Sequence, residues 1–153
     1  MDVRQALRAL RATQFPRVEV VHTRYADLDP QRHVNNAALG TLFAEARSGI
    51  AHEVLERAGR EPGFVMMVAQ FAVSYVGQVC HPRALEVGVG VIETGPKFVR
   101  VVQALFQDGT CRAVAESVLL GTRDSRGAEL PEAVRVEWLS LALPDGLVPR
   151  QLR

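Results

Sequence analysis

The sequence predicts an α+β fold in which one long helix packs on an antiparallel sheet. The first observation is a long segment with helical apolar spacing at 36–59, and the second is a series of β-rich runs that follows it. The third is the Asp-Gly pair at 108–109 between two of those runs, which is typical of a tight hairpin because both residues tolerate positive φ. An antiparallel sheet must bury one face, and the long helix can cover it.

The first residues predict a helix and then a strand. Residues 1–14 form an amphipathic pattern with Val3, Leu7 and Leu10 on one side, so we expect a surface helix that packs on the domain. Residues 17–24 alternate and are rich in β-branched side chains, which indicates a strand. A polar loop at 25–35 follows, and its Asp-Pro pair at 29–30 favours an extended or turning backbone.

The segment 36–59 predicts one helix. Apolar residues recur at spacings of three and four, the period of a helical face: Leu39, Phe43, Ala46, Ile50 and Val54. Asn35 or Asn36 can cap its start, and Gly59 can end it. Alanines fill much of the remainder and the first turns carry few bulky side chains, so we expect burial on more than one side.

The rest of the chain predicts four more strands and a closing helix. The strands are expected at 64–76, 84–93, 98–107 and 110–122, separated by turn-forming Gly-Gln, Gly-Pro and Asp-Gly pairs. Residues 131–141 predict a short helix with Trp138 packed inward. One helix cannot cover five long strands, so we expect exposed edges and apolar faces to meet another subunit.

Size and composition narrow the class of protein. The 153 residues fit one domain, 1–153, with an N-terminal helical extension at 1–15 and a C-terminal tail at 130–153. The formal net charge is +1 and the basic residues are scattered, so we expect no nucleic-acid partner. No apolar run approaches the roughly 20 residues of a membrane span, and a signal peptide's apolar core is lacking. We therefore expect no membrane association and a cytoplasmic location.

Cysteine and histidine usage points away from disulfides and metals. Cys80 and Cys111 are expected in strands far apart in the sequence, as reduced thiols. His22, His52 and His81 lack ligand-like spacing, so we expect no metal.

The polar loop carries the residues that suggest chemistry. Asp29 and His33 lie beside the start of the long helix, whose unsatisfied N–H groups can stabilise an oxygen that becomes negative. A carboxylate beside such a terminus can attack a carbonyl, which predicts an enzyme. Asp29 could be a nucleophile, a general base on water or simply part of an Asp-Pro turn. His33 could position water, bond to Asp29 or satisfy the loop. Asp27 would share the face of Asp29 if the segment were a strand, although orienting the loop suits it better.

Three short motifs resemble a known family. They are Arg-Tyr-Ala-Asp-Leu-Asp at 24–29, His-Val-Asn-Asn at 33–36 and Phe-x-Glu-Ala-Arg at 43–47. The pattern is similar to the 4-hydroxybenzoyl-CoA thioesterase-like family of acyl-CoA thioesterases, and it continues in outline from residue 17 through Tyr75 to Leu130-Pro131. The resemblance implies a hot-dog fold, in which a five-stranded antiparallel sheet wraps a long central helix. It also implies hydrolysis of an acyl-CoA thioester to a carboxylic acid and free CoA, without a cofactor.

The resemblance also implies roles. By position Asp29 is the catalytic carboxylate, and the N–H near Asn36 polarises the thioester carbonyl, with His33 as a further catalytic candidate. The family works as a homodimer or as a dimer of dimers, a homotetramer, with each active site built across a subunit interface. Candidate substrate-binding residues are Asn35, apolar side chains for the acyl group and basic side chains near sheet turns for CoA phosphates: Leu39, Phe43, Met66, Met67, Arg83, Lys97 and Arg100.

Three positions depart from the family pattern. Arg32 precedes the histidine where Gly is usual, and Leu39 stands where Tyr is frequent. Lys97-Phe98 replace a frequent Ser after the Gly-Pro turn. These changes affect loop geometry, the acyl pocket and the CoA rim, so they bear on the substrate more than on the reaction.

Other functions stay open from the sequence. The same fold could carry a hydratase or dehydratase acting on acyl thioesters, or a non-catalytic acyl-CoA-binding module. Acyl carrier protein could replace CoA. Glu45 on the helix could supply the carboxylate, as in a related hot-dog branch.

Overall fold

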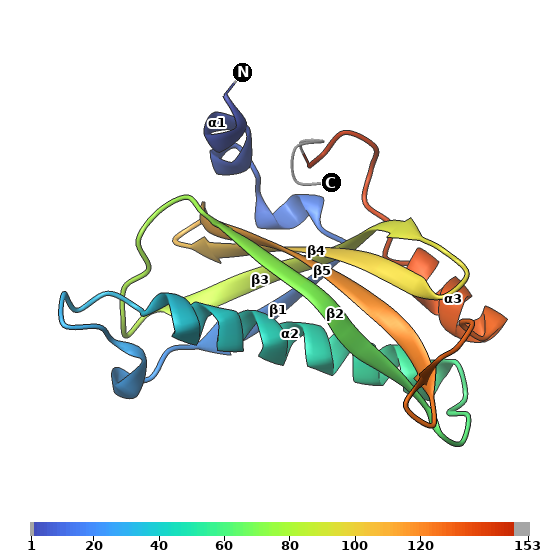
Figure 1. Ribbon diagram of the computed structural model, residues 1–153. Helices are drawn as coiled ribbons and strands as arrows, with labels where there is room; N and C mark the ends of the chain where they lie inside the picture. Colours follow the sequence, from blue (N-terminus) through green and yellow to red (C-terminus); the bar gives the residue numbers. More distant parts are fainter. Residues whose placement is uncertain (1, 149–153) are drawn as a thin grey trace.

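The computed structural model describes residues 2–148, so Met1 and residues 149–153 of the expected C-terminal tail lie outside the described residues. Figure 1 shows the arrangement of the elements. In chain order they are α1 (Val3–Arg8), the 3-10 helix η1 (Ala12–Gln14), β1 (Arg17–His22), the 3-10 helix η2 (Tyr25–Asp27), α2 (Asn36–Arg57), β2 (Phe64–Tyr75), β3 (Ala84–Thr94), β4 (Phe98–Gln107), β5 (Thr110–Arg123), β6 (Arg126–Gly127) and α3 (Glu132–Leu139).

The five long strands form one antiparallel sheet in the order β1-β3-β4-β5-β2, and the two-residue β6 pairs with the end of β5. The sheet curls around α2, which crosses its concave face (Figure 1). The predicted hot-dog fold, a five-stranded antiparallel sheet around a long central helix, is confirmed. β1 and β2 lie at the two ends of the strand order.

Local signals in the sequence set the element ends. The β4–β5 hairpin turns at Asp108 and Gly109, which have φ of 51° and 71°. Both positive values are those that the Asp-Gly pair predicted. At the end of α2 the chain reverses through Gly59, whose φ of 78° suits a residue without Cβ.

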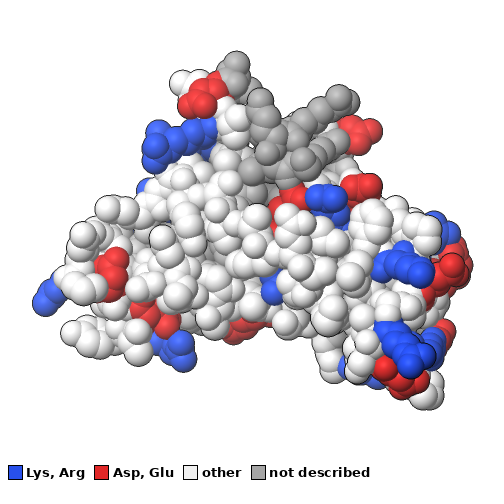
Figure 2. All heavy atoms as spheres, in the orientation of Figure 1, with Lys and Arg blue, Asp and Glu red and all other residues white. Residues whose placement is uncertain are grey.

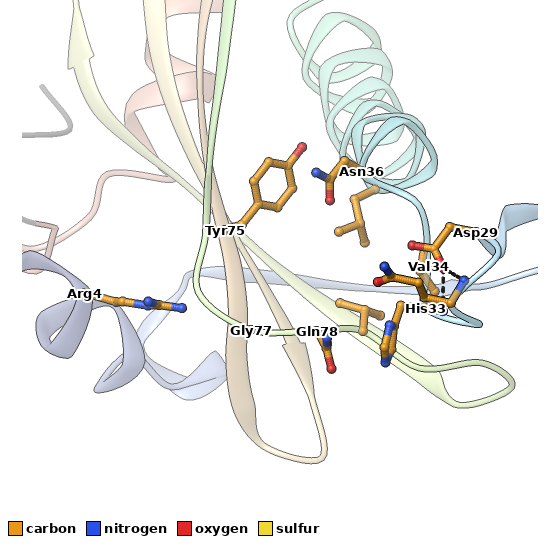
Figure 3. A pocket seen from close by; sticks show the side chains of 11 residues that line it. Arg4, Asp29, His33, Val34, Asn36, Tyr75, Gly77 and Gln78 are labelled. Carbon is orange, nitrogen blue, oxygen red and sulfur yellow. Dashed lines mark hydrogen bonds between the residues drawn. The ribbon is translucent and has the colours of Figure 1, made fainter.

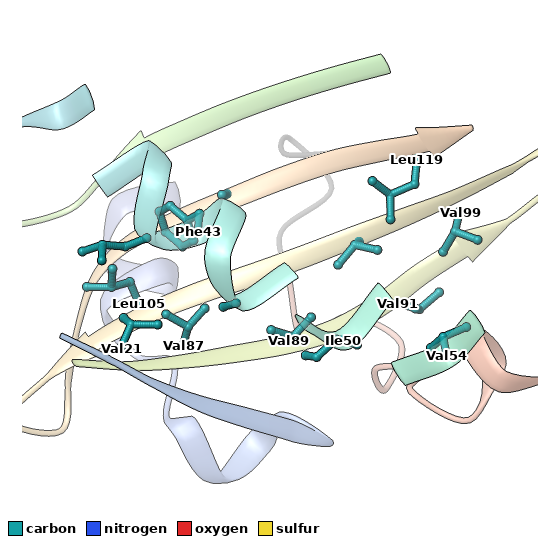
Figure 4. Packing of buried hydrophobic residues seen from close by; sticks show 14 of the residues in the cluster. Val21, Phe43, Ile50, Val54, Val87, Val89, Val91, Val99, Leu105 and Leu119 are labelled. Carbon is teal, nitrogen blue, oxygen red and sulfur yellow. The ribbon is translucent and has the colours of Figure 1, made fainter. Parts of the chain in front are cut away.

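The larger core lies between α2 and the concave face of the sheet. The α2 side chains point toward those of the strands in Figure 4, among them Phe43, Ile50, Val54, Val87, Val89, Val99, Leu105 and Leu119. Trp138 of α3 is fully buried in the same core, as its sequence position predicted. Because apolar area removed from water drives folding, this core fixes α2 against the sheet and so fixes the loop that precedes it.

A second core covers the outer face of the sheet. Leu7 and Leu10 from the α1 segment and Phe15 after η1 pack against apolar side chains of the strands, together with Leu143 and Val148 near the chain's other end. The amphipathic segment expected as one helix over 1–14 is instead α1 followed by η1.

The Arg11 side chain explains why α1 ends before residue 11. Its guanidinium folds back and donates hydrogen bonds to the carbonyls of Arg8, Ala9 and Leu10 at 3.1, 3.0 and 2.8 Å. These bonds satisfy carbonyls that a longer helix would have used, so α1 ends there.

The prediction that Cys80 lies in a strand is wrong. Cys80 lies in the connection between β2 and β3. Gln107 holds that connection by accepting from the Cys80 N–H at 3.0 Å and donating to the Cys80 carbonyl at 2.8 Å. A side chain thus replaces the ladder bonds of a strand. Cys111 does lie in β5, and both thiols are free.

Candidate active site

Asp29 organises the loop between β1 and α2. Its Oδ1 accepts hydrogen bonds from the N–H groups of Gln31 and His33 at 2.9 and 3.0 Å. Its own N–H donates to the His33 carbonyl at 2.8 Å, and its carbonyl accepts from the Arg32 N–H at 2.9 Å. Within residues 2–148 the other carboxylate oxygen, Oδ2, has no hydrogen-bond partner. One oxygen therefore holds the loop while the other stays free.

Arg32 occupies the loop position that needs the left-handed backbone. Its φ is 64°, a value that favours glycine. The glycine usual before the histidine in the family pattern fits this geometry, and this chain retains the geometry with an arginine. The left-handed conformation costs a residue with Cβ roughly 1–2 kcal/mol, which the closed hydrogen-bonded turn offsets.

The start of α2 presents a backbone donor to the same region. The Asn35 side chain accepts from the Ala37 N–H at 2.8 Å, and its carbonyl accepts from the Leu39 N–H at 3.0 Å. The Asn36 N–H has no protein acceptor in the part of the chain that the structure describes. Helix N-termini carry partial positive charge, so this N–H can bind an oxygen with developing negative charge.

These groups line one cleft with a volume of about 380 Å³. Its walls come from α1, the β1–α2 loop, the start of α2, the end of β2 and the β2–β3 connection: Arg4, Asp29, Gln31, His33, Val34, Asn36, Leu39, Tyr75, Gly77, Gln78 and Val79. In Figure 3 the Tyr75 ring reaches toward Asn36, while the His33 ring points away from the Asp29 carboxylate. The cleft thus combines a carboxylate, a helix terminus and a phenol.

The structure brings together some of the residues predicted from the sequence. Asp29, His33, Asn36 and Leu39 line the cleft, and Asn35 caps the helix beside it. No imidazole hydrogen bond joins His33 to Asp29 among the described residues, because His33 meets that carboxylate through its backbone N–H.

Other predicted substrate-binding residues lie elsewhere in this subunit. Phe43 is fully buried in the core, where its ring packs edge-on against Phe71 with centroids 6.3 Å apart. Met66 and Met67 lie near the opposite end of β2 from Tyr75, about 30 Å away at ~3.3 Å per strand residue. Lys97 lies at that far end as well, since its carbonyl accepts from Gly121, the residue opposite Met66.

The remaining predicted basic residues are already paired. Arg100 forms ion pairs with Glu93 and Glu116, and Arg83 forms one with Asp108. Neither arginine lines the cleft.

Sequence reasoning did not assign cleft roles to Arg4, Tyr75 or Gln78. Tyr75 stood at the end of the long apolar run, where a polar aromatic before a glycine turn could have signalled a site. Gln78 lies in the Gly-Gln turn that the sequence did identify. Arg4 carries no such signal, because its place in the cleft depends on how α1 packs across the sheet.

The two alternative carboxylates face a different pocket. Asp27 and Glu45 line a cavity of about 250 Å³ with His22, Arg24 and Thr41. Asp27 lies in η2 and not on a strand, so it does not share a face with Asp29. The Arg24 guanidinium and N–H hold the pKa of the Asp27 carboxyl below its usual value. Its carbonyl also accepts from the Asn35 N–H at 2.8 Å, which ties η2 to the start of α2.

Residues 2–148 show neither a metal cluster nor a membrane helix. No group of three or more His, Cys, Asp or Glu side chains there is placed to hold a metal ion. None of the described helices has the length and apolar character needed to cross a membrane.

A family model and one solved structure show the family of this chain. Residues 23–139 match the model of the thioesterase-like superfamily. A search of curated protein sequences finds no match. Among solved structures, a thioesterase from Thermus thermophilus complexed with coenzyme A and Zn is 30% identical, with a TM-score of 0.70, and the alignment covers 84% of this chain and 95% of that one.

Two more solved structures share the fold. A protein of Pseudomonas aeruginosa strain PAO1 is 24% identical with a TM-score of 0.77, covering 87% of this chain and 96% of that one. A predicted thioesterase from Bacillus stearothermophilus is 21% identical with a TM-score of 0.76, covering 84% and 98%. At such identities the likeness shows the fold alone. Because the family match runs from the end of β1 through α3, this protein belongs to the thioesterase-like superfamily of hot-dog proteins.

Proposed function

We propose that the protein hydrolyses an acyl-CoA thioester to a carboxylic acid and free CoA. The observation that carries the proposal is the pairing of two groups in one cleft: the Asp29 carboxylate with a free Oδ2, and the Asn36 N–H at the start of α2. The 30% identical thioesterase was solved with coenzyme A, which favours the same carrier here.

The chemistry has two routes, and Asp29 serves either. As a nucleophile, Oδ2 adds to the thioester carbonyl, CoA thiolate leaves, and water then cleaves the resulting anhydride to the acid and the free carboxylate. As a general base, the carboxylate takes a proton from water, hydroxide adds to the carbonyl, and the thiolate leaves and is protonated. In both routes the Asn36 N–H stabilises the carbonyl oxygen as it becomes negative, a contribution of about 10²–10³ in turnover for one donor.

Neither route needs a cofactor, because a thiolate is a good leaving group and the thioester carbonyl is reactive. We infer that Leu39 and the apolar wall beside it contact the acyl group. We place the reaction in the cytoplasm, whose reducing conditions suit the two free thiols.

The test measures thiol release from a panel of acyl-CoAs, aliphatic and aromatic, by wild type, Asp29→Asn and the control Asp145→Asn. Asparagine keeps an Oδ1 that can accept from Gln31 and His33, so the loop should hold while the reactive oxygen is lost. We expect Asp29→Asn to lose at least about 100-fold in kcat. The exposed Asp145→Asn should match wild type.

Turnover that survives Asp29→Asn would reject the assigned carboxylate and direct attention to Asp27 or Glu45. A change in enoyl absorbance without thiol release would indicate a hydratase. Binding of acyl-CoA without turnover, by wild type and variant alike, would indicate a binding module.

A further inference from the structure

Three arginine side chains meet beside the cleft, around the end of β2. Arg4 and Arg8 of α1 each donate from Nη2 to the Val76 carbonyl, at 3.4 and 3.3 Å. Arg112 of β5 accepts from the N–H groups of Val76 and Gly77 through its carbonyl, at 2.8 and 2.9 Å. Its side chain then lies over Gly77, where a Cβ would come within 3.3 Å of Cδ and Nη1. We call Arg4, Arg8 and Arg112 the arginine cluster.

The arginine cluster brings three basic side chains to the end of β2. None of its members forms an ion pair with a carboxylate of residues 2–148. The Arg112 Nε is in addition buried and has no hydrogen-bond partner in the part of the chain that the structure describes. The Arg4 and Arg8 guanidinium groups share the Val76 carbonyl, and the Arg112 side chain lies over the next residue, Gly77. Like charges so placed repel one another, so an anion bound beside them would be stabilised. The neighbouring Arg11 differs, because its guanidinium caps the end of α1.

The arginine cluster is held at a fixed place relative to Asp29. Leu7 and Leu10 are buried in the outer core and anchor α1 against the sheet. Arg4 lines the cleft itself, and Figure 3 shows it entering from α1 on the side opposite Asp29. Basic side chains gather at the same α1 corner in Figure 2.

We propose that the arginine cluster binds the phosphate groups of the CoA carrier, an inference that rests on the proposed function. CoA joins its thioester to its phosphates through a long flexible arm, so a phosphate site must lie along the cleft and away from the catalytic carboxylate. Guanidinium groups suit phosphate oxygens because they donate two parallel, charge-assisted hydrogen bonds. Arg83 and Arg100, predicted for this role, are occupied by acidic partners.

Most of the arginine cluster lies outside the region that defines the family. The superfamily match begins at residue 23, and α1 ends at Arg8. The N-terminal extension thus supplies two of the three guanidinium groups, Arg4 in the lining of the cleft and Arg8 beside it on the Val76 carbonyl. We infer that it gives the site its preference for a thioester carrying phosphates.

The experiment compares two thioesters with the same acyl group, acyl-CoA and acyl-pantetheine, which lacks the phosphates. The variant is Arg4→Gln/Arg8→Gln. The control is Arg57→Gln/Arg60→Gln, a double change at the far end of α2 where both arginines pair with acids. Arg112 is left in place because its backbone supports β2.

We expect the variant's preference in kcat/KM for acyl-CoA over acyl-pantetheine to fall by about tenfold or more, through KM. The KM of wild type for acyl-CoA should rise with salt, and the KM of the variant should respond less. The control should keep the wild-type preference.

Equal losses on both thioesters would overturn the proposal, because they would mean that the two arginines only anchor α1. An unchanged preference for acyl-CoA over acyl-pantetheine in the variant would overturn it as well. If wild type cleaves no thioester, the proposed function fails separately. In that case the affinities of free CoA and of pantetheine are measured by calorimetry and test the arginine cluster by themselves. Wild type must bind CoA more tightly than pantetheine, and the variant must lose that difference in affinity.

Discussion

Asp27 and Asp29 lie two residues apart, but their carboxylates have different hydrogen-bond partners. The Asp27 carboxylate accepts from the Arg24 N–H at 2.7 Å and from the Arg24 guanidinium at 2.8 Å. Asp29 instead bonds to backbone N–H groups and keeps one oxygen free in the cleft. The paired carboxylate therefore supports the loop, and the partly free one lines the cleft.

Asp27 should make stability depend on pH. Arg24 lowers the pKa of Asp27 in the folded protein, so the unfolded chain binds that proton more readily. The stabilisation is complete above the ordinary carboxyl pKa of about 4 and is lost as pH falls through the lower folded value. We expect Asp27→Asn to reduce the fall in the free energy of unfolding over this acid window, measured by urea titration at several pH values. Wild-type and variant curves with equal slopes there would contradict the assignment.

The site could be predicted only as far as local sequence determines it. The Asp-Pro turn and the Asn35 cap act over a few residues, so Asp29, His33, Asn36 and Leu39 were correctly expected near one helix start. Arg4 was not assigned to the cleft, because its position follows from the packing of α1 on strands more than seventy residues away.

At the scale of elements, Arg47 joins α2 to two strands. Its Nη1 donates to Gln103 Oε1 of β4 at 3.2 Å and to Ser117 Oγ of β5 at 3.1 Å. Its guanidinium carbon lies 5.2 Å from the centroid of the Phe71 ring. Burial lowers the pKa of Arg47, since the charge is taken out of water. The structure shows neutral acceptors and an aromatic face around this cation.

A double-mutant cycle tests this connection. Ser117→Ala removes an acceptor from a buried cation and should cost about 1–3 kcal/mol in the free energy of unfolding. In an Arg47→Met background the same change should cost clearly less, because the cation is absent. Urea denaturation of the four proteins gives the coupling. Additive costs would mean that the serine does not support Arg47.

The elements themselves were predicted closely where a local signal marks each end. The helix expected at 36–59 is Asn36–Arg57, and the strand expected at 98–107 is Phe98–Gln107. The segment 1–14 was less accurate, because amphipathic spacing does not reveal that the Arg11 side chain would end the helix. The strand order β1-β3-β4-β5-β2 was not predicted, because it depends on pairing between residues far apart in the sequence, which periodicity does not reveal.

At the scale of the whole molecule, β2 leaves apolar side chains in water. It lies at one end of the strand order and exposes large hydrophobic residues: Val65, Met67, Val68, Phe71 and Tyr75. An exposed apolar strand edge invites pairing with a second copy. We propose a homodimer or homotetramer joined along this edge, which would also bring a partner's residues toward the cleft beside Tyr75.

Mass measurement tests the assembly. Light scattering at micromolar concentration should give twice the 16.8 kDa of the chain or a higher even multiple. Met67→Glu, at a side chain 51% exposed, should shift the mass toward the monomer and lower activity with it. Val136→Glu, on α3 and 54% exposed, is the matched control and should change neither. A wild-type monomer would reject an active site built across subunits.

The short helix α1 contributes to two parts of the molecule: its apolar face packs in the outer core, and its Arg4 lines the cleft. Any ligand that binds Arg4 also holds the helix down, because a ligand favours whichever state it contacts. Local opening of the first residues and release of the carrier would then be a single linked equilibrium. A ligand bound in the cleft would therefore slow hydrogen exchange of the α1 backbone amides, although these amides lie far from the thioester bond that reacts.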